Sequence, residues 1–399
     1  MRGEKEMLTE NQQKEVINLC QDLIRIRSYS GQEEMLAAKL ADTFKAMGFD
    51  EILTDDYGNV IGHMRGSKPG KVILFDGHMD TVPADESQWS KAPFEGIIEE
   101  RRIYGRGASD MKGAISAMVC AAANYARSTK KDFAGDIYIA GVVYEECFEG
   151  IASRKVSEKV NPDYVVIGEA SECNIKRGQR GRAEIVIETF GKSAHSSNPK
   201  AGINAVYSMT NLIDEIRKIK PVHHDFLGDG ILELTDIKSS PYPGASVVPD
   251  YCRATFDRRL LVGETKESVL QPIKDIIARM EKDDPNFKAK VSYALGEEKC
   301  YTGTKIQGER FFPAWLYDEK EDFIQKTYEG LKSAGFQPEI THYSFCTNGS
   351  HYAGEANIKT LGFGPSKESL AHIVDEYIEI EQLLKATCGY YEIIKALLS

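Results

Sequence analysis

Apolar residues near the N-terminus recur at the three- and four-residue spacing of an amphipathic helix. The residues that form this stripe are Val16, Leu19, Cys20, Leu23 and Ile24. A second helical pattern spans 33–47 and is followed by Gly48, a residue type that often ends helices. We therefore predict that the chain begins with two helices.

Four later apolar runs lack the alternation of a half-exposed strand. They span 60–64, 71–75, 136–144 and 163–167. Between the second and third runs, the Ala-rich segment 113–126 is apolar and long enough to be a buried helix. Continuous apolar strands separated by helices indicate a mostly parallel sheet that helices cover on both faces. The predicted fold class is therefore α/β.

The pattern changes near Gly181, where apolar and polar residues begin to alternate as in a strand with one exposed face. The predicted strands and helices that follow span 183–190, 205–218, 231–238, 251–260, 267–282 and 288–293. Their βαββαβ order is that of a ferredoxin-like unit with an antiparallel sheet. We expect an inserted domain at 182–294 and a discontinuous domain at 1–181 and 295–399, which ends in a long helix at 378–398.

The composition restricts the class of partner. The chain has 399 residues, which favours two domains, and its 50 Lys and Arg against 61 Asp and Glu give a formal net charge of −11. This acidic excess argues against binding to nucleic acid or to an anionic membrane, because both need a basic surface.

The sequence also predicts the compartment. No apolar stretch is long enough to span a membrane, and the polar N-terminus carries no signal segment. The eight cysteines include no CxxC pair and are expected to be reduced thiols. These features favour a cytoplasmic protein.

Metal-binding residue types follow three of the predicted strands. In chain order they are His78, Asp80, Glu145, Glu146 and Glu169. Ligands of open α/β sheets bind beyond the carboxyl ends of the strands, so these side chains are expected to share one crevice.

Two further candidates lie in loops. Asp110 belongs to the glycine-rich segment 105–113, which leads into the Ala-rich helix, and His372 precedes the last helix. Asp110 alone could simply cap that helix. His, Asp and Glu together, without Cys, form the ligand set of a catalytic site for one or two divalent ions, with zinc the first choice. Two ions roughly 3.5–4 Å apart would together polarise a carbonyl and generate hydroxide.

Motifs of other enzyme classes are incomplete. Gly191-Lys192-Ser193 resembles the end of a P-loop, but position 186 is Val instead of the first glycine. The sequence contains no GxGxxG, GxSxG or HExxH motif. The pair His223-His224 lies in a loop rich in Pro, Gly and Asp, and we interpret it as a solvated surface pair.

Four segments, taken in order, resemble a known family. They are GHMDTVP at 77–83, GRGASDMKG at 105–113, EE at 145–146 and GKSAHS at 191–196. They are similar to the metallopeptidase family of acetylornithine deacetylase, succinyl-diaminopimelate desuccinylase, aminoacylase and glutamate carboxypeptidases. The resemblance runs from Asp22 to His372. The overall sequence pattern is most similar to that of the selenium-metabolism-linked hydrolase branch.

The resemblance implies two divalent ions per subunit, with zinc first and cobalt or manganese as alternatives. His78 and Glu169 would bind one ion, and Glu146 and His372 would bind the other. Asp110 would bridge both ions.

The resemblance also implies the catalytic groups. Asp80 would fix the His78 imidazole from behind, and Glu145 would be the general base that activates the bridging water. The inserted domain would be a lid that also forms a homodimer. His195 would reach from it into the active site of the partner subunit and stabilise the oxyanion.

Substrate contacts are less defined. Many relatives have a Gly-Gly-Ser/Thr-Asp loop on the carboxylate side of the substrate, whereas Asn348 and His351 stand here where Gly and Asp are expected. Asn348 and Gly349 are the candidates for substrate contact in this loop. Arg258 could bind a substrate carboxylate from the lid or form a salt bridge at a strand edge, and both interpretations stay open.

These expectations describe a hydrolase that cleaves a C–N amide bond in a small polar molecule, such as an N-acyl amino acid or a dipeptide. One alternative is an aminopeptidase or tripeptidase that acts on short peptides. Another is a catalytically silent metal-binding relative, which the presence of base, ligands and Asp80 disfavours.

Overall fold

The computed structural model describes residues 8–398, which divide into two compact units. Within the described residues, unit 1 comprises 8–179, Glu297–Gln307 and 316–398, and unit 2 comprises Arg180–Gly296 and Gly308–Trp315. The second segment of unit 2 lies outside the insert expected from the sequence. It belongs there because β19 (Phe311–Phe312) pairs with a strand of the unit 2 sheet, β9 (Gly181–Phe190).

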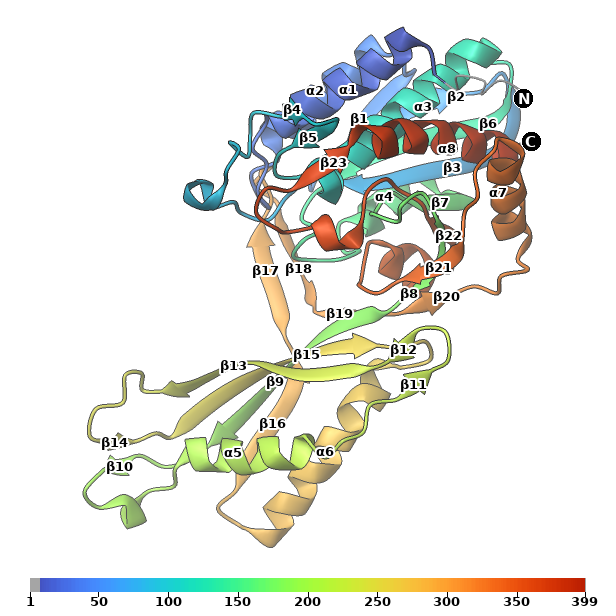
Figure 1. Cartoon of the computed structure of the whole chain (residues 1–399). Coiled ribbons are helices and arrows are strands. Elements are labelled where there is room, and N and C mark those ends of the chain that lie inside the picture. Colours follow the sequence, from blue (N-terminus) through green and yellow to red (C-terminus); the bar gives the residue numbers. More distant parts are fainter. Residues whose placement is uncertain (1–7, 399) are drawn as a thin grey trace. The chain divides into compact units, whose positions relative to one another are not determined.

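Unit 1 is built on a mixed sheet with the strand order β1-β2-β6-β3-β7-β22-β8-β20, where β20 is Trp315–Leu316, and β21 also pairs with β8 (Figure 1). The other strands are β1 (Glu51–Thr54), β2 (Val60–Arg65), β3 (Lys68–His78), β6 (Ala134–Val142), β7 (Tyr164–Ile167), β8 (Ile175–Gln179), β21 (Ile340–Tyr343) and β22 (Lys359–Gly362). The central strands β6, β3, β7 and β22 are parallel neighbours, whereas β1, β2 and β8 join antiparallel. The predicted mostly parallel α/β sheet is confirmed.

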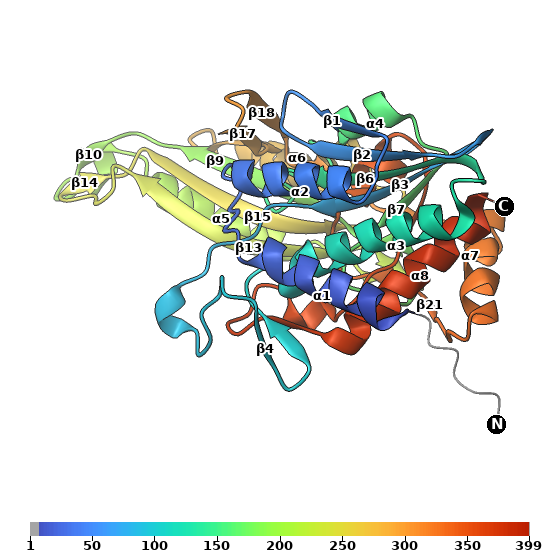
Figure 2. The same cartoon turned by 90° about the horizontal axis from the view of Figure 1, so that it is seen from above.

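Helices cover both faces of this sheet (Figure 2). They are α1 (Glu10–Ile24), α2 (Glu34–Ala46), α3 (Gly113–Thr129), α4 (Ser153–Val160), α7 (Asp322–Ser333) and α8 (Ile380–Leu398). The buried face of α1 consists of the apolar stripe seen in the sequence. The helix α3 approaches β3 so closely that a Cβ on Gly77 would lie 2.9 Å from Cγ1 of Ile115, which explains the glycine directly before His78.

A small antiparallel sheet joins two distant parts of unit 1. Its order is β23-β5-β4, where β4 is Ile97–Glu99, β5 is Arg102–Tyr104 and β23 is Tyr377–Glu379. The last helix was expected to begin at residue 378, but it begins at Ile380. The preceding residues pair with β5 instead, with Ile378 opposite Ile103.

Unit 2 has an antiparallel sheet in the order β13-β15-β9-β16. Its elements are β9, α5 (Ala205–Ile216), β13 (Ile231–Ser240), β15 (Tyr251–Leu260), α6 (Lys266–Asp283) and β16 (Lys288–Tyr293). Their chain order is the predicted βαββαβ. Buried residues of β9 and β15, such as Ile185, Ile187 and Ala254, share one core with Met209 of α5 and Ile273 of α6.

The remaining short strands are β10 (Ala194–His195), β11 (His223–His224), β12 (Gly228–Asp229), β14 (Val247–Val248), β17 (Leu295–Lys299) and β18 (Lys305–Glu309). All eight cysteines are free thiols, in agreement with the sequence. Within residues 8–398, none of the helices has both the length and the apolar character needed to cross a membrane.

Candidate metal centre

The strands β3, β6 and β7 lie side by side and parallel, so their carboxyl ends meet at one edge of the sheet. His78 is the last residue of β3, opposite Val142 at the end of β6. Glu145 and Glu146 follow β6, and Glu169 follows β7. The chain therefore delivers an imidazole and three carboxylates to the same edge.

Two loops complete the centre. Asp110 lies in the irregular segment Ala108–Lys112 that precedes α3, and His372 lies a few residues before β23. Because β23 pairs with β5 and β5 leads into the Asp110 loop, the small sheet holds these two loops together.

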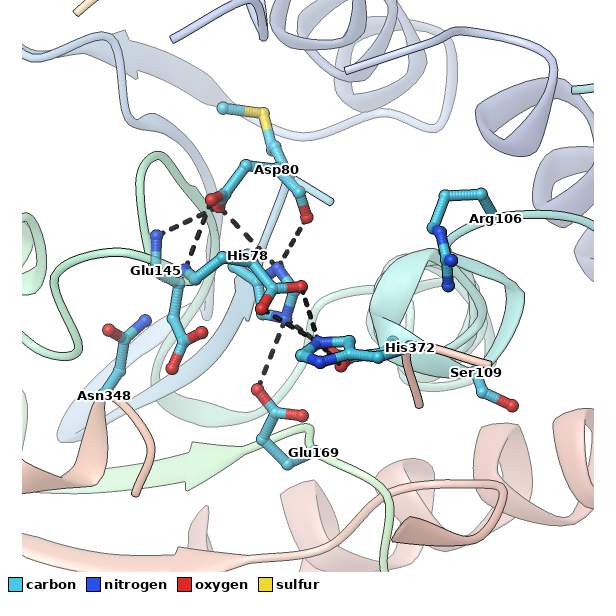
Figure 3. Close-up of polar contacts among 12 residues, drawn as sticks. His78, Asp80, Arg106, Ser109, Glu145, Glu169, Asn348 and His372 are labelled. Carbon is cyan, nitrogen blue, oxygen red and sulfur yellow. Dashed lines mark hydrogen bonds and ion pairs between the residues drawn. The ribbon is translucent and has the colours of Figure 1, made fainter. Parts of the chain in front are cut away.

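The side chains form two groups that share Asp110. In the first group, Nε2 of His78 lies 2.8 Å from Oδ1 of Asp110 and 3.4 Å from Oε1 of Glu169. In the second, Nε2 of His372 lies 3.2 Å from Oδ2 of Asp110 and 3.0 Å from Oε2 of Glu146. The ligand atoms within each group all lie within 4.8 Å of one another. Figure 3 shows His78, Glu169 and His372 directed toward a common region.

The two groups differ in access to solvent. The side chain of His78 is only 1% exposed, whereas that of His372 is 52% exposed. The first group is therefore enclosed by the protein, and the second is open on the His372 side. Solvent therefore reaches the centre from the His372 side.

The carboxylates of the centre are difficult to ionise together. Burial, reinforced by the charge of Asp110, raises the pKa of Glu146 to about 7 and also raises the pKa of Glu169. The pKa of Asp110 is lowered, because hydrogen bonds from His372 and His78 outweigh its burial. Without metal, protons and protonated histidines thus balance the negative charge.

The neighbouring carboxylates raise the pKa of both histidines. Hydrogen bonds to Asp110 and Glu146 raise the pKa of His372 to about 10. Burial opposes protonation of His78, but its bonds to Asp110 and Glu169 raise its pKa well above the usual value. Asp110, Glu145, Glu146 and Glu169 carry up to four negative charges, which two divalent cations would neutralise. The donor set of imidazole and carboxylate therefore fits such cations.

Glu145 lies beside the two groups without belonging to either (Figure 3). Its pKa is raised well above the usual value, chiefly by burial; the charge of His78 lowers this pKa, and the carboxylates of Glu169 and Glu146 raise it. Residues of both groups thus act on the charge of Glu145. A carboxylate with a raised pKa is a stronger base than an ordinary Glu side chain and holds a proton more readily.

Asp80 contacts the centre in a different way from that expected. Nδ1 of His78 lies 2.8 Å from the main-chain carbonyl oxygen of Asp80, whereas the Asp80 carboxylate is 3.7 Å away. The carboxylate accepts hydrogen bonds from the main-chain N–H groups of Glu145 and Glu146 and from the hydroxyl of Ser30. Asp80 therefore orients the imidazole through its backbone and the Glu145–Glu146 pair through its side chain.

The loop with Asn348 and Gly349 is buried and internally hydrogen bonded. Nδ2 of Asn348 donates to Oδ1 of Asp76, its Oδ1 accepts from Gly150 N–H, and the N–H of Gly349 donates to Thr347. Asp76 lies two residues before His78 in β3. The loop thus supports the strand that carries His78, and contact of Asn348 or Gly349 with substrate stays a prediction.

Two predicted residues belong to unit 2. Arg258 is buried and donates to the Glu264 carboxylate and to the carbonyl of Ile231, which agrees with the salt-bridge interpretation. His195 is exposed on β10, and its Nδ1 accepts hydrogen bonds from the main-chain N–H and the hydroxyl of Ser197. The functional roles of both residues stay predictions.

Three residues that hold the centre from behind were not predicted from the sequence: Ser30, Glu33 and Glu376. Glu33 accepts from the N–H of Tyr144, directly before Glu145, and Glu376 accepts from the N–H of Asp110. Glu33 stands at the start of a helical pattern, and Glu376 stands in an ordinary acidic pair. No local signal distinguishes them, because their partners are far away in the sequence.

Comparisons with known proteins agree with this geometry. Residues 74–396 match the sequence profile of Peptidase family M20/M25/M40. The uncharacterized protein YgeY of Escherichia coli (strain K12) is 32% identical over 376 residues, with 91% of this chain and 90% of that protein covered. A succinyl-diaminopimelate desuccinylase of Pelagibacter ubique is 28% identical, with 95% of this chain and 98% of that protein covered.

Solved structures show the same fold. The aminopeptidase PepT of Bacillus cereus superposes with a TM-score of 0.75 at 19% identity, over 98% of this chain and all (100%) of that chain. The YXEP protein of Bacillus subtilis, described as a dinuclear metal binding peptidase, gives a TM-score of 0.73 at 16% identity, over 98% and 99% of the chains. The family resemblance is confirmed, whereas the selenium-linked branch stays a prediction.

Proposed function

Because the chain belongs to Peptidase family M20/M25/M40, a family of metal-dependent hydrolases, we propose that it cleaves a C–N amide bond in a small polar substrate. N-acyl amino acids and dipeptides are the substrate classes we favour. The observation that carries this proposal is the pair of three-residue groups that share Asp110, with Glu145 beside them.

Each group would hold one divalent ion. His78 and Glu169 would bind the enclosed ion, Glu146 and His372 the more exposed ion, and Asp110 would face both with its two oxygens. Imidazole and carboxylate ligands suit zinc first, with cobalt and manganese as alternatives. Such ions, when bound, supply Lewis-acid polarisation of a carbonyl and lower the pKa of bound water.

Glu145 would move the proton. Its carboxylate accepts a proton from the attacking water and returns it to the leaving amine, so one residue serves as base and then as acid. The raised pKa of Glu145, caused chiefly by burial, makes its carboxylate a stronger base for the first of these steps. The hydrogen bond from its N–H to Asp80 keeps the residue in place during the transfer.

Unit 2 would contribute the oxyanion donor and the dimer contact. Because Nδ1 of His195 accepts a hydrogen bond from the N–H of Ser197, the neutral ring carries its proton on Nε2. An exposed Nε2–H is available to a developing negative charge. We propose that His195 acts in the active site of the partner subunit of a homodimer, with unit 2 as a lid.

A metal-reconstituted activity screen tests the function. The protein, loaded with zinc, cobalt or manganese, is offered N-acyl amino acids, carbamoyl amino acids, dipeptides and tripeptides. Metal-dependent hydrolysis of an acylated amino acid or a dipeptide is the expected result. Turnover confined to peptides with free N-termini would favour an aminopeptidase or tripeptidase, and metal binding without any turnover would leave the silent relative. The cytoplasmic location stays a prediction.

A further inference from the structure

Glu376 is fully buried, at 0% exposure, and its carboxylate faces the loop that carries Asp110. Its Oε1 accepts hydrogen bonds from the main-chain N–H groups of Ser109 at 2.8 Å and Asp110 at 3.0 Å. Its Oε2 accepts from the N–H of Gly107 at 3.1 Å and from Nη1 of Arg106 at 2.7 Å. We propose that Glu376 is the positioning residue that sets the place of Asp110 between the two metal groups.

This loop has no acceptor of its own for these amides. Asp110 and Met111 have non-helical backbone angles, and neither this segment nor the start of α3 has a side-chain cap. Amide groups that precede a helix need an acceptor from elsewhere, and an ionised carboxylate forms the stronger kind of hydrogen bond. Glu376 supplies that acceptor from a part of the chain 266 residues away.

Glu376 also ties the loop to the second metal group. It follows His372 by four residues, and its own carbonyl accepts from the N–H of Gly105 at 2.9 Å. The neighbouring Asp375 carboxylate accepts from the N–H and hydroxyl of Ser90, which anchors the same segment. One short segment thereby holds the imidazole of His372 and the backbone of Asp110 in register.

An alternative is that Glu376 only balances a buried cation. Arg106 is buried and forms an ion pair with it. Charge balance alone does not require three main-chain amides of the loop as donors. We therefore assign Glu376 to the loop geometry, with Arg106 as its buried ion-pair partner.

The variant E376Q tests this role, which rests on the proposed two-metal function. Gln has about the same size as Glu, but an NH₂ group replaces one of the two carboxylate oxygens. This NH₂ group would face N–H donors, whose hydrogen bonds it cannot accept. The matched control is E379Q, because Glu379 lies three residues further on at the end of β23, is 45% exposed and forms an ion pair with Arg102 on the surface. Hydrogen exchange of the loop at 105–112 is measured in metal-free protein, followed by titration with cobalt(II) and steady-state kinetics.

In E376Q we expect faster exchange at Gly107, Ser109 and Asp110, about 10- to 100-fold weaker cobalt binding and an altered visible cobalt spectrum. The value of kcat falls while KM changes little. E379Q matches wild type throughout. If E376Q does not fold, E376D serves instead, and its shorter side chain is expected to give the same changes to a smaller extent.

Wild-type loop exchange together with wild-type cobalt affinity in the folded variant would overturn the proposal. Failure of the proposed function gives a different result: wild-type protein itself then binds fewer than two cobalt ions or turns nothing over. The exchange comparison uses metal-free protein, so it still decides what Glu376 does for the loop.

Discussion

The carboxylate of Asp80 accepts the main-chain N–H of Glu145 at 3.0 Å through Oδ1. Its second oxygen accepts the N–H of Glu146 at 3.2 Å, so a single side chain orients the proposed base and a proposed metal ligand. The carbonyl of the same residue orients His78. Asp80 therefore connects both metal groups and the base within one residue.

Replacing Asp80 by Asn is expected to reduce kcat about 10- to 100-fold. The Asn amide has the same shape, but its NH₂ faces an N–H donor whichever way it turns, so the Glu145–Glu146 backbone shifts. Steady-state kinetics of metal-loaded D80N checks this. The variant S30A is the control, because it removes only the hydroxyl donor to Asp80. An equal loss of kcat in S30A and D80N would contradict the account.

Substitution of Glu145 by Ala is expected to lower kcat about 100- to 10,000-fold, the usual contribution of a general base. Metal content stays near that of wild type, because Glu145 belongs to neither ligand group. Kinetics and elemental analysis of the same sample measure both quantities. Retained turnover in E145A, or loss of bound metal, would reject the assignment of Glu145 as the base.

Metal affinity is expected to weaken as the pH falls from about 8 to 6. Burial raises the pKa of Glu146 to about 7, and hydrogen bonds to Asp110 and Glu146 raise the pKa of His372 to about 10 in the metal-free protein. Both groups therefore hold protons that an ion must displace. Calorimetric titration with zinc in two buffers of different ionisation enthalpy counts the released protons. Affinity independent of pH, with no proton release, would contradict the proposed ligands.

Mixing inactive subunits tests whether unit 2 forms the dimer and whether its His195 acts in the active site of the partner subunit. If His195 serves the partner's active site, an E145A chain paired with an H195A chain forms one site with both Glu145 and His195 intact. Mixed dimers then regain activity that neither parent has. If His195 acts within its own subunit, every site in the mixture lacks one group and activity stays low. The control is a mixture of two separate preparations of E145A. Every site in this mixture lacks Glu145, so its activity is expected to stay low.

The contribution of Glu355 to the stability of the fold can be tested independently of the metal centre. Burial disfavours its charge, but hydrogen bonds with His351 and Arg154 lower its pKa to about 2. A lowered folded-state pKa means that the stabilisation is complete above the unfolded pKa of about 4.3 and is lost as the pH falls toward 2. E355Q is expected to lower the free energy of unfolding by about 1 kcal/mol at pH 7. The difference from wild type narrows below pH 4, as denaturant unfolding at several pH values would show.

The sequence predicted the features that local patterns encode. The apolar stripe of α1 and the uninterrupted apolar runs of β3, β6 and β7 are strong local patterns. Because ligands of such sheets bind beyond the carboxyl ends of the strands, these patterns also placed His78, Glu145 and Glu169 together. Asp110 and His372 were recognisable because a glycine-rich loop and a family resemblance marked their positions.

Contacts between distant buried polar groups could not be predicted. Glu376 and Asp110 are 266 residues apart, and Ser30 and Asp80 are 50 residues apart, so no spacing rule relates them. The start of α8 was misplaced for a similar reason: residues 378 and 379 suit a helix locally, but pairing with β5 makes them a strand. Tertiary contacts decided each of these cases.

The central claim is that two divalent ions lie side by side with Asp110 between them. Anomalous diffraction from crystals of the zinc-loaded protein tests it most directly. The account predicts two peaks roughly 3.5–4 Å apart, one touched by His78 and Glu169, the other by Glu146 and His372, and both by Asp110. A single peak, or peaks away from these residues, would contradict it.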